Sequence, residues 1–241
     1  MDGSSLTMTS AHHCCIDDEN NILLFDRTIE KHREIKILEI DFVQNQGEIV
    51  SSHGFSEEEL KKSSKVELWV GLCCPLSKVL WMDLKDGWIC DTFDVNVLEK
   101  KLGGLISKCK REFANIRECI VLSSQFHSIK NKLLSSEFLC NNFKIVHDLP
   151  MVEVYATKCI TPAFVFLEYM NYQLSELAWD DIVAVDVSFF TSDVDIVNLI
   201  IKHRPLEWIL YSFDKSEHQR VRNIIEACPY KTIIPQFNYT L

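Results

Sequence analysis

Residues 143–169 constrain the fold more than any other stretch, because two short apolar runs flank a helical pattern. The runs at 144–146 and 163–167 are rich in β-branched and aromatic residues, which favours strands buried on both faces. Between them, apolar residues recur at helical spacing: Met151, Val154, Tyr155 and Cys159. Because a crossover helix normally joins parallel neighbours, this unit predicts a parallel sheet covered by helices.

The length of 241 residues and an apolar content of 47% suit one packed domain. We predict a single α/β domain over residues 22–228, with a mixed, mostly parallel β-sheet flanked by helices. Residues 1–21 are polar and are predicted to form a disordered leader. Residues 229–241 contain two prolines and are predicted to form an extended C-terminal tail.

Other segments have patterns of their own. Two strand-like runs at 66–74 and 78–84, followed by the turn Asp86-Gly87, predict an antiparallel meander. Helical periodicity covers residues 173–187 and 193–203, and an apolar run predicts a strand at 207–213.

The charge and the cysteines bound the partners and the compartment. A formal net charge of −10 disfavours nucleic acid, whose affinity for proteins depends on Lys and Arg neutralising phosphates, and favours a basic protein surface. No apolar run approaches the roughly 18–20 residues that span a membrane. The ten cysteines follow no signal peptide, so we predict a reducing cytosolic or nuclear location.

The motifs of common cofactor and nucleophile sites are missing from the sequence. Its seven glycines form neither a G-x-G-x-x-G motif nor a P-loop, both of which bring backbone amides against phosphate. A G-x-S-x-G nucleophile elbow is also absent. We therefore predict no bound cofactor.

The adjacent residues His147 and Asp148 form the main candidate for catalysis. Such a pair can ligate metal in phosphohydrolases, which also supply an upstream His and a downstream Asp. Here the pair leaves an apolar strand, so we interpret Asp148 as a helix cap and His147 as a partner of local backbone groups. In this interpretation His147, Asp148, Leu149 and Pro150 form a structural turn. The alternative is an α/β hydrolase or phosphorylase-like enzyme that uses the pair.

The run His12-His13-Cys14-Cys15 contains four side chains that can ligate metal. Structural zinc sites usually separate paired ligands by two to four residues and need a second pair. We therefore predict no metal site and assign this run to the leader.

The sequence Ile145-Val146-His147-Asp148-Leu149-Pro150, with the following helical pattern and Ile160-Thr161-Pro162-Ala163, resembles the family of proteasome assembly chaperone 1. The resemblance covers roughly residues 143–170. It implies a non-catalytic chaperone that pairs with proteasome assembly chaperone 2. The heterodimer would cap the outer face of the 20S proteasome α-ring, bind its α-subunits and promote ring assembly.

The same resemblance implies a role for the C-terminal tail. Members of the family insert a terminal hydrophobic-Tyr-any-residue motif between α-subunits of the ring. In this chain Tyr239 is third from the end and Asn238 precedes it, so the motif is shifted. The residues expected to contact the ring are Phe237, Tyr239, Thr240 and Leu241.

Overall fold

The computed structural model describes residues 9–12, 35–52, 54–85, 93–109, 119–149, 163–177, 181–203, 206–212, 214–228 and 233–238. Nine strands of this part form one sheet. They are β1 (Thr9–His12), β2 (Ile35–Asn45), β3 (Glu48–Ser51), β4 (Val79–Lys85), β5 (Ile120–Ser123), β6 (Lys144–Leu149), β7 (Ile182–Asp186), β8 (Glu207–Tyr211) and β9 (Ile233–Asn238).

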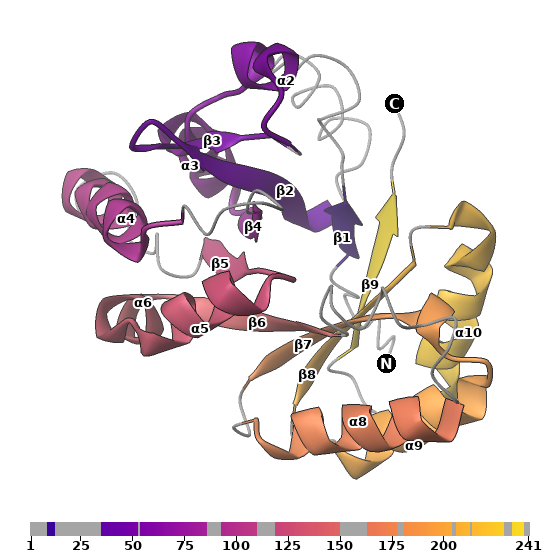
Figure 1. Cartoon of the computed structure of the whole chain (residues 1–241). Coiled ribbons are helices and arrows are strands. Elements are labelled where there is room, and N and C mark those ends of the chain that lie inside the picture. Colours follow the sequence, from indigo (N-terminus) through magenta and orange to yellow (C-terminus); the bar gives the residue numbers. More distant parts are fainter. Residues whose placement is uncertain are drawn as a thin grey trace, which may run out of the picture.

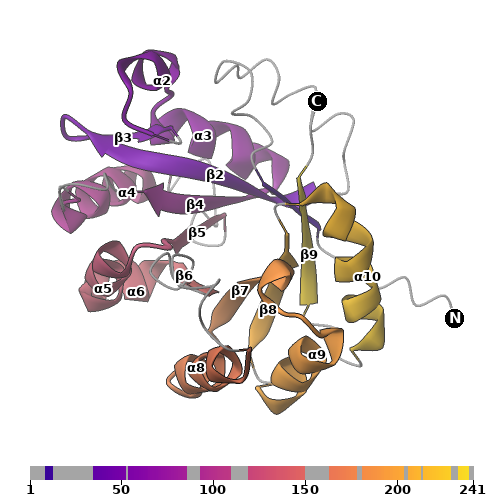
Figure 2. The same cartoon turned by 45° about the vertical axis from the view of Figure 1, so that its right-hand side comes forward.

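The sheet closes into a barrel (Figures 1 and 2). Its strands follow the order β1-β9-β8-β7-β6-β5-β4-β2, and β1 also pairs with β2, which completes the ring. Every pairing around the ring is parallel, whereas β3 pairs antiparallel with β2. The prediction of a single α/β domain with a mixed, mostly parallel sheet flanked by helices is confirmed.

Helices lie outside the ring of strands (Figure 2). The described α-helices are α2 (Glu57–Lys62), α3 (Val66–Cys73), α4 (Val95–Cys109), α5 (His127–Ser135), α6 (Glu137–Asn142), α8 (Ala163–Ser175), α9 (Asp193–Lys202) and α10 (His218–Ala227). Short 3-10 helices are η1 (Cys74–Leu76), η2 (Val187–Phe189) and η3 (Lys215–Glu217). Within these segments no helix has the length and apolar character needed to cross a lipid bilayer.

Two apolar layers join the helices to the barrel wall. On one side, the outward residues of β2 and β4 pack against α3, α4, α5 and α6. On the other side, the outward residues of β7 and β8 pack against α8, α9 and α10. Each fully buried Leu, Ile or Val side chain in these layers stabilises the fold by about 1.5–3 kcal/mol. The layers hold the strands in place, so their inner faces can carry polar groups.

The inside of the barrel changes character along the strands. Its packed residues are Ile37, Trp81, Val121, Val146, Ile182, Ala184, Ile209 and Tyr211. On β2 and β4 the inward positions that follow Ile37 and Trp81 are charged: Glu39, Asp41, Asp83 and Lys85. Because side chains alternate along a strand, these charges share one face with the apolar residues before them.

The predicted antiparallel meander is wrong. Residues 66–73 form helix α3, and β4 pairs in parallel with both β2 and β5. The apolar run fits a helix because its buried residues, Val66, Trp69, Val70 and Cys73, recur every three or four positions. A short apolar run cannot by itself distinguish a buried helix from a buried strand.

Two neighbouring predictions also need correction. Residues 163–167 begin helix α8 instead of forming a strand, and the predicted helix at 173–187 contains strand β7. The predicted crossover helix lies at 151–159, outside the described residues. The predicted helix at 193–203 and the strand at 207–213 are confirmed as α9 and β8.

The predicted boundaries of the domain change as well. Strand β1 lies inside the segment assigned to a disordered leader, and β9 lies inside the segment assigned to a free tail. The two strands pair with each other, and β1 also pairs with β2. Thr9-Ser10-Ala11-His12 has no apolar alternation, so only pairing with distant strands identifies it as part of the barrel.

Candidate carboxylate site in the barrel

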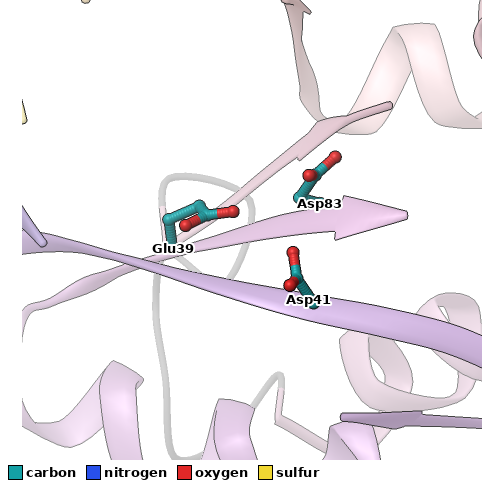
Figure 3. A group of neighbouring side chains, drawn as sticks. All are labelled: Glu39, Asp41 and Asp83. Atoms are coloured by element: carbon teal, nitrogen blue, oxygen red, sulfur yellow. The ribbon is translucent and has the colours of Figure 1, made fainter. Parts of the chain in front are cut away.

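Three carboxylate side chains converge inside the barrel (Figure 3). Glu39 and Asp41 come from β2, and Asp83 comes from the neighbouring strand β4. Asp41 and Asp83 are register partners, and one oxygen from each of the three side chains lies within 4.8 Å of the others. The alternation of both strands therefore brings residues 44 positions apart or less in sequence to one point.

The three carboxyl groups are buried, and they share a basic neighbour. Glu39, Asp41 and Asp83 are 3%, 1% and 2% exposed. Lys85 Nζ lies 3.2 Å from Asp41 Oδ1 and also contacts Asp83 Oδ2. Its side chain is 15% exposed. Among the described residues, three buried acids thus face one ammonium group, which leaves an excess of negative charge when all four groups are ionised.

Burial and the neighbouring charges shift the pKa values of Glu39, Asp83 and Lys85. Burial, together with repulsion from Asp41 and Asp83, raises the pKa of Glu39 well above its usual range. Burial also raises the pKa of Asp83, although the attraction of Lys85 opposes the shift. Burial would lower the pKa of Lys85, but the acids around it raise that pKa well above its ordinary value. Lys85 therefore stays charged, and the cluster favours any further positive charge.

A polar group from β6 also faces the inside of the barrel. The Asp148 carboxylate accepts hydrogen bonds from Gln125 Nε2 at 3.0 Å and from the Tyr211 hydroxyl at 2.9 Å. Burial and repulsion from Asp83 raise the pKa of Asp148 to about 7. Its described side-chain partners are thus a residue that follows the neighbouring strand β5 and a residue of β8. The helix that Asp148 was predicted to cap lies outside the described residues.

His147 lies on the other side of the barrel wall. Alternation in β6 turns its buried ring toward the helices, where Nε2 is 3.4 Å from Asp181 Oδ2. Burial and the nearby charge of Lys130 lower the pKa of His147 to about 4. His147 and Asp148 therefore face opposite layers, and the two side chains do not form one catalytic pair. Leu149 is buried in the outer apolar layer with α8, and Pro150 lies outside the described residues.

The other residues considered in the sequence analysis, in the His12–Cys15 run and the C-terminal tail, are only partly described. His12 ends β1, and its backbone is the register partner of Glu39. Phe237 lies in β9 with its backbone in register with Ala11. It therefore belongs to the barrel wall and not to an extended tail beyond the domain. His13, Cys14, Cys15, Tyr239, Thr240 and Leu241 lie outside the described residues.

The donor set of the cluster suits a hard divalent cation. Mg²⁺, Ca²⁺ and Mn²⁺ prefer carboxylate oxygens, and Glu39, Asp41 and Asp83 each offer one within a small volume. The location agrees with this chemistry. β4 ends at Lys85, β5 at Ser123 and β8 at Tyr211, and the carboxyl ends of the strands are where closed parallel barrels place their active sites.

Comparisons with known proteins give a result for structure only. Neither a scan against models of protein families nor a search of curated proteins finds a match. Among solved structures, the chain is similar to a candidate glycerophosphoryl diester phosphodiesterase from Agrobacterium tumefaciens, with 12% identity, coverage of 95% of this chain and 93% of the other, and a TM-score of 0.60.

Two further structures belong to the same class of protein. A glycerophosphodiester phosphodiesterase from Parabacteroides distasonis has 12% identity, 96% and 92% coverage and a TM-score of 0.59. One from Thermotoga maritima has 13% identity, 95% and 92% coverage and a TM-score of 0.52. At such low identity the likeness establishes a shared fold.

The resemblance to proteasome assembly chaperones is wrong. It rested on a short stretch of β6 and the residues after it, whereas the fold of almost the whole chain is shared with phosphodiesterases. The expectation of a non-catalytic chaperone is corrected with it. The implied partners, proteasome assembly chaperone 2 and the 20S α-subunits, had no other basis and remain untested.

The carboxylate cluster was not predicted from the sequence, but strands β2 and β4 contain a signal for it. Glu39-Ile40-Asp41 and Asp83-Leu84-Lys85 each place two charges on one face of a largely apolar strand. A charge on a buried strand is costly unless it is paired or holds a ligand. Two such pairs therefore indicate a functional site, although the sequence does not show that their strands are neighbours.

Proposed function

We propose that this chain is a divalent-cation-dependent phosphodiesterase that hydrolyses glycerophosphodiesters. The observation that carries the proposal is the convergence of Glu39, Asp41 and Asp83 inside a closed parallel barrel. The shared fold with glycerophosphodiester phosphodiesterases supports the choice of reaction and of substrate class.

The charge of the cluster explains why a cation is needed. A phosphodiester is an anion, and three buried carboxylates would repel it. Glu39, Asp41 and Asp83 would hold the cation, which acts as a Lewis acid toward phosphoryl oxygens and supplies several kcal/mol of charge stabilisation. The bound cation would thereby turn an acidic site into one that attracts phosphate.

Lys85 has a separate role in this proposal. Its ammonium group contacts Asp41 and Asp83, and its raised pKa keeps it protonated through the neutral range. Its position at the end of β4 lets it bind a phosphate oxygen as a point charge. Lys85 therefore orients the substrate beside the carboxylates that hold the cation.

The test is hydrolysis by the purified full-length protein. Glycerophosphocholine, glycerophosphoethanolamine and glycerophosphoglycerol are supplied with Mg²⁺, Ca²⁺ or Mn²⁺, or with EDTA, and released glycerol phosphate is measured. We expect turnover that depends on the cation and is lost in Asp83→Asn. Failure to hydrolyse all three substrates with every cation, or equal rates in wild type and Asp83→Asn, would refute the proposal.

We also propose a cytosolic or nuclear location, because the described cysteines Cys119, Cys140 and Cys228 are free thiols. Free thiols are expected where glutathione and thioredoxin keep cysteines reduced. Imaging of a tagged full-length chain tests this proposal, and a signal confined to the secretory pathway would contradict it.

A further inference from the structure

A chain of hydrogen bonds inside the barrel ends on Asp83. Trp81 Nε1 lies 2.6 Å from Ser123 Oγ, and Ser123 Oγ lies 3.2 Å from Asp83 Oδ1. The three residues are 2%, 0% and 2% exposed, so water does not compete for these contacts. Trp81 and Asp83 share the inner face of β4, and Ser123 is the register partner of Asp83 on β5.

The chemistry of the groups fixes the direction of both hydrogen bonds. An indole N–H can only donate, so Ser123 Oγ must accept from Trp81. A serine hydroxyl has a single proton, and in this arrangement that proton points to Asp83 Oδ1. Without the indole, the hydroxyl could rotate and give its proton elsewhere. Trp81 therefore determines where Ser123 donates.

Asp83 is held from two sides as a result. Ser123 donates to Oδ1, and Lys85 contacts Oδ2. The two contacts come from different strands, so together they restrict rotation of the carboxylate plane. Each oxygen of the carboxylate has further lone pairs that can face a cation shared with Glu39 and Asp41.

We propose that Trp81 and Ser123 are positioning residues that orient Asp83 for a divalent cation. This inference rests on the proposed function, because it takes Asp83 as a ligand of that cation. Partners that orient a ligand from behind typically change metal affinity by about 10- to 100-fold. Trp81 and Ser123 act on the cation only through Asp83. Their effect is therefore on the orientation of the Asp83 carboxylate and on the affinity for the cation.

The first measurement is calorimetric titration of the cation-free, full-length protein with Mn²⁺ or Ca²⁺ alone. We expect Ser123→Ala to raise the dissociation constant about 10-fold, and Ser123→Thr, which keeps the hydroxyl, to stay within about threefold of wild type. Trp81→Phe keeps an aromatic ring but removes the donor. It should raise the dissociation constant roughly 3- to 10-fold, because the Ser123 proton is then free to rotate.

Two variants are matched controls. Trp208 is 1% exposed, lies in the outer apolar layer, and its indole Nε1 makes no hydrogen bond within the described part of the chain. Trp208→Phe therefore makes the same change in side-chain shape as Trp81→Phe without removing a hydrogen bond of the described structure. Ser124 Oγ donates to the backbone oxygen of Leu84 at 2.6 Å, so Ser124→Ala removes a buried hydroxyl that does not contact Asp83. Both controls should keep the wild-type dissociation constant.

Tryptophan fluorescence supplies a readout that a merely structural residue would not change. Binding of Mn²⁺ or Ca²⁺ at Asp83 should alter the emission of Trp81 through Ser123. The cation-dependent change should disappear in Trp81→Phe and persist in Trp208→Phe. A thermal melt of each variant confirms that it is folded before titration.

The outcomes separate this inference from the proposed function. If wild type binds a cation and hydrolyses substrate while folded Ser123→Ala and Trp81→Phe bind as wild type does, the positioning role is refuted and the function stands. If affinity depends on Ser123 but no phosphodiester is hydrolysed, the positioning role stands and the function is refuted. If wild type binds none of Mg²⁺, Ca²⁺ and Mn²⁺, both are refuted.

Discussion

His147 and Asp148 are consecutive residues of β6, yet they lie in different environments. Asp148 faces the inside of the barrel, where burial and Asp83 raise its pKa to about 7. His147 faces the helices, where burial and Lys130 lower its pKa to about 4. Burial therefore shifts both side chains toward their neutral forms, in opposite directions on the pH scale.

The two environments differ in the balance of charge, and this difference separates a candidate site from ordinary packing. Outside the wall, His147 has one acid and one base near it, Asp181 and Lys130. Inside, Glu39, Asp41 and Asp83 converge with Lys85 as their basic partner. A shifted pKa alone does not identify a site. A cluster of negative charges that exceeds its positive partners predicts a positively charged ligand.

Among the changes that test this difference between the two environments, Asp83→Asn should have the largest effect, and that effect is on hydrolytic activity. The substitution removes one charged ligand but keeps the size of the side chain. A cation contributes several kcal/mol to charge stabilisation, so we expect activity to fall roughly 10²- to 10³-fold. The measurement is the rate of glycerol phosphate release at saturating cation.

His147→Leu is the matched control for that measurement, since it alters a buried titratable residue on the outer side of the wall. Its rate should stay within about threefold of wild type once it is folded, because it lies outside the barrel interior. Loss of activity in His147→Leu with none in Asp83→Asn would reverse the assignment of the site.

The sequence was informative about local structure and less so about closure. Residues 193–213 alternate helix and strand in the order that α9 and β8 show, and the α/β class follows from such alternation. Closure depends on β1, whose polar sequence Thr9-Ser10-Ala11-His12 pairs with strands about 25 and more than 200 residues away. Local patterns contain no information about such partners.

The candidate site could be predicted only in part, because local patterns show which side chains share a strand face but not which strands pair. The charges of Glu39-x-Asp41 and Asp83-x-Lys85 stand out within apolar strands, so their presence on one face could be predicted. Their meeting in space depends on the pairing of β2 with β4, which is a long-range property. The sequence around His147 and Asp148 led to the wrong family because apolar crossovers occur in many unrelated α/β folds.

Cation binding at Glu39, Asp41 and Asp83 should have the next largest effect, and that effect is on the stability of the folded protein. A ligand that binds only the folded state at 100 times its dissociation constant stabilises by about 2.7 kcal/mol. For a domain of this length we expect Mn²⁺ or Ca²⁺ to raise the melting temperature by roughly 5–10 °C, and EDTA to reverse the change. The same addition should leave Asp83→Asn nearly unchanged. An equal shift in both proteins would place the cation elsewhere.

Asp148→Asn tests the inner member of the pair through pH. The folded pKa of about 7 lies above the usual value of 3.8, so the folded state holds more protons between these pH values and wild type loses stability as pH rises through them. Asn cannot ionise. In cation-free protein, urea unfolding at pH 5 and pH 8 should show the variant gaining about 2–3 kcal/mol over wild type at the higher pH. A constant difference would mean that Asp148 does not carry this pH dependence.

His147→Leu tests the outer member and should show the opposite slope. The folded pKa of about 4 lies below the usual 6.5, so the unfolded chain binds the proton first and wild type loses stability as pH falls from 6.5 to 4. Within the described part of the chain, Lys130 and Asp181 are the charged groups that face the ring. Relative to wild type, the variant should gain about 2 kcal/mol between pH 7 and pH 4.5 in urea unfolding. A gain that appears instead on raising the pH would contradict the burial of a neutral ring.

Tyr211→Phe should have the smallest effect, and it tests whether Asp148 belongs to the inner network. The substitution removes the hydroxyl that donates to Asp148 Oδ1 at 2.9 Å. A hydrogen bond to a charged acceptor contributes more than one to a neutral acceptor, so the loss should be about 1–2 kcal/mol at pH 8 and under about 1 kcal/mol at pH 5. Tyr172 is 61% exposed, and Tyr172→Phe should change stability by less than about 0.5 kcal/mol at either pH. In an Asp148→Asn background the pH dependence of the Tyr211→Phe loss should vanish, because Asn stays neutral throughout. If it persists there, the hydroxyl of Tyr211 acts on a group other than Asp148, and the inner network must be redrawn around that group.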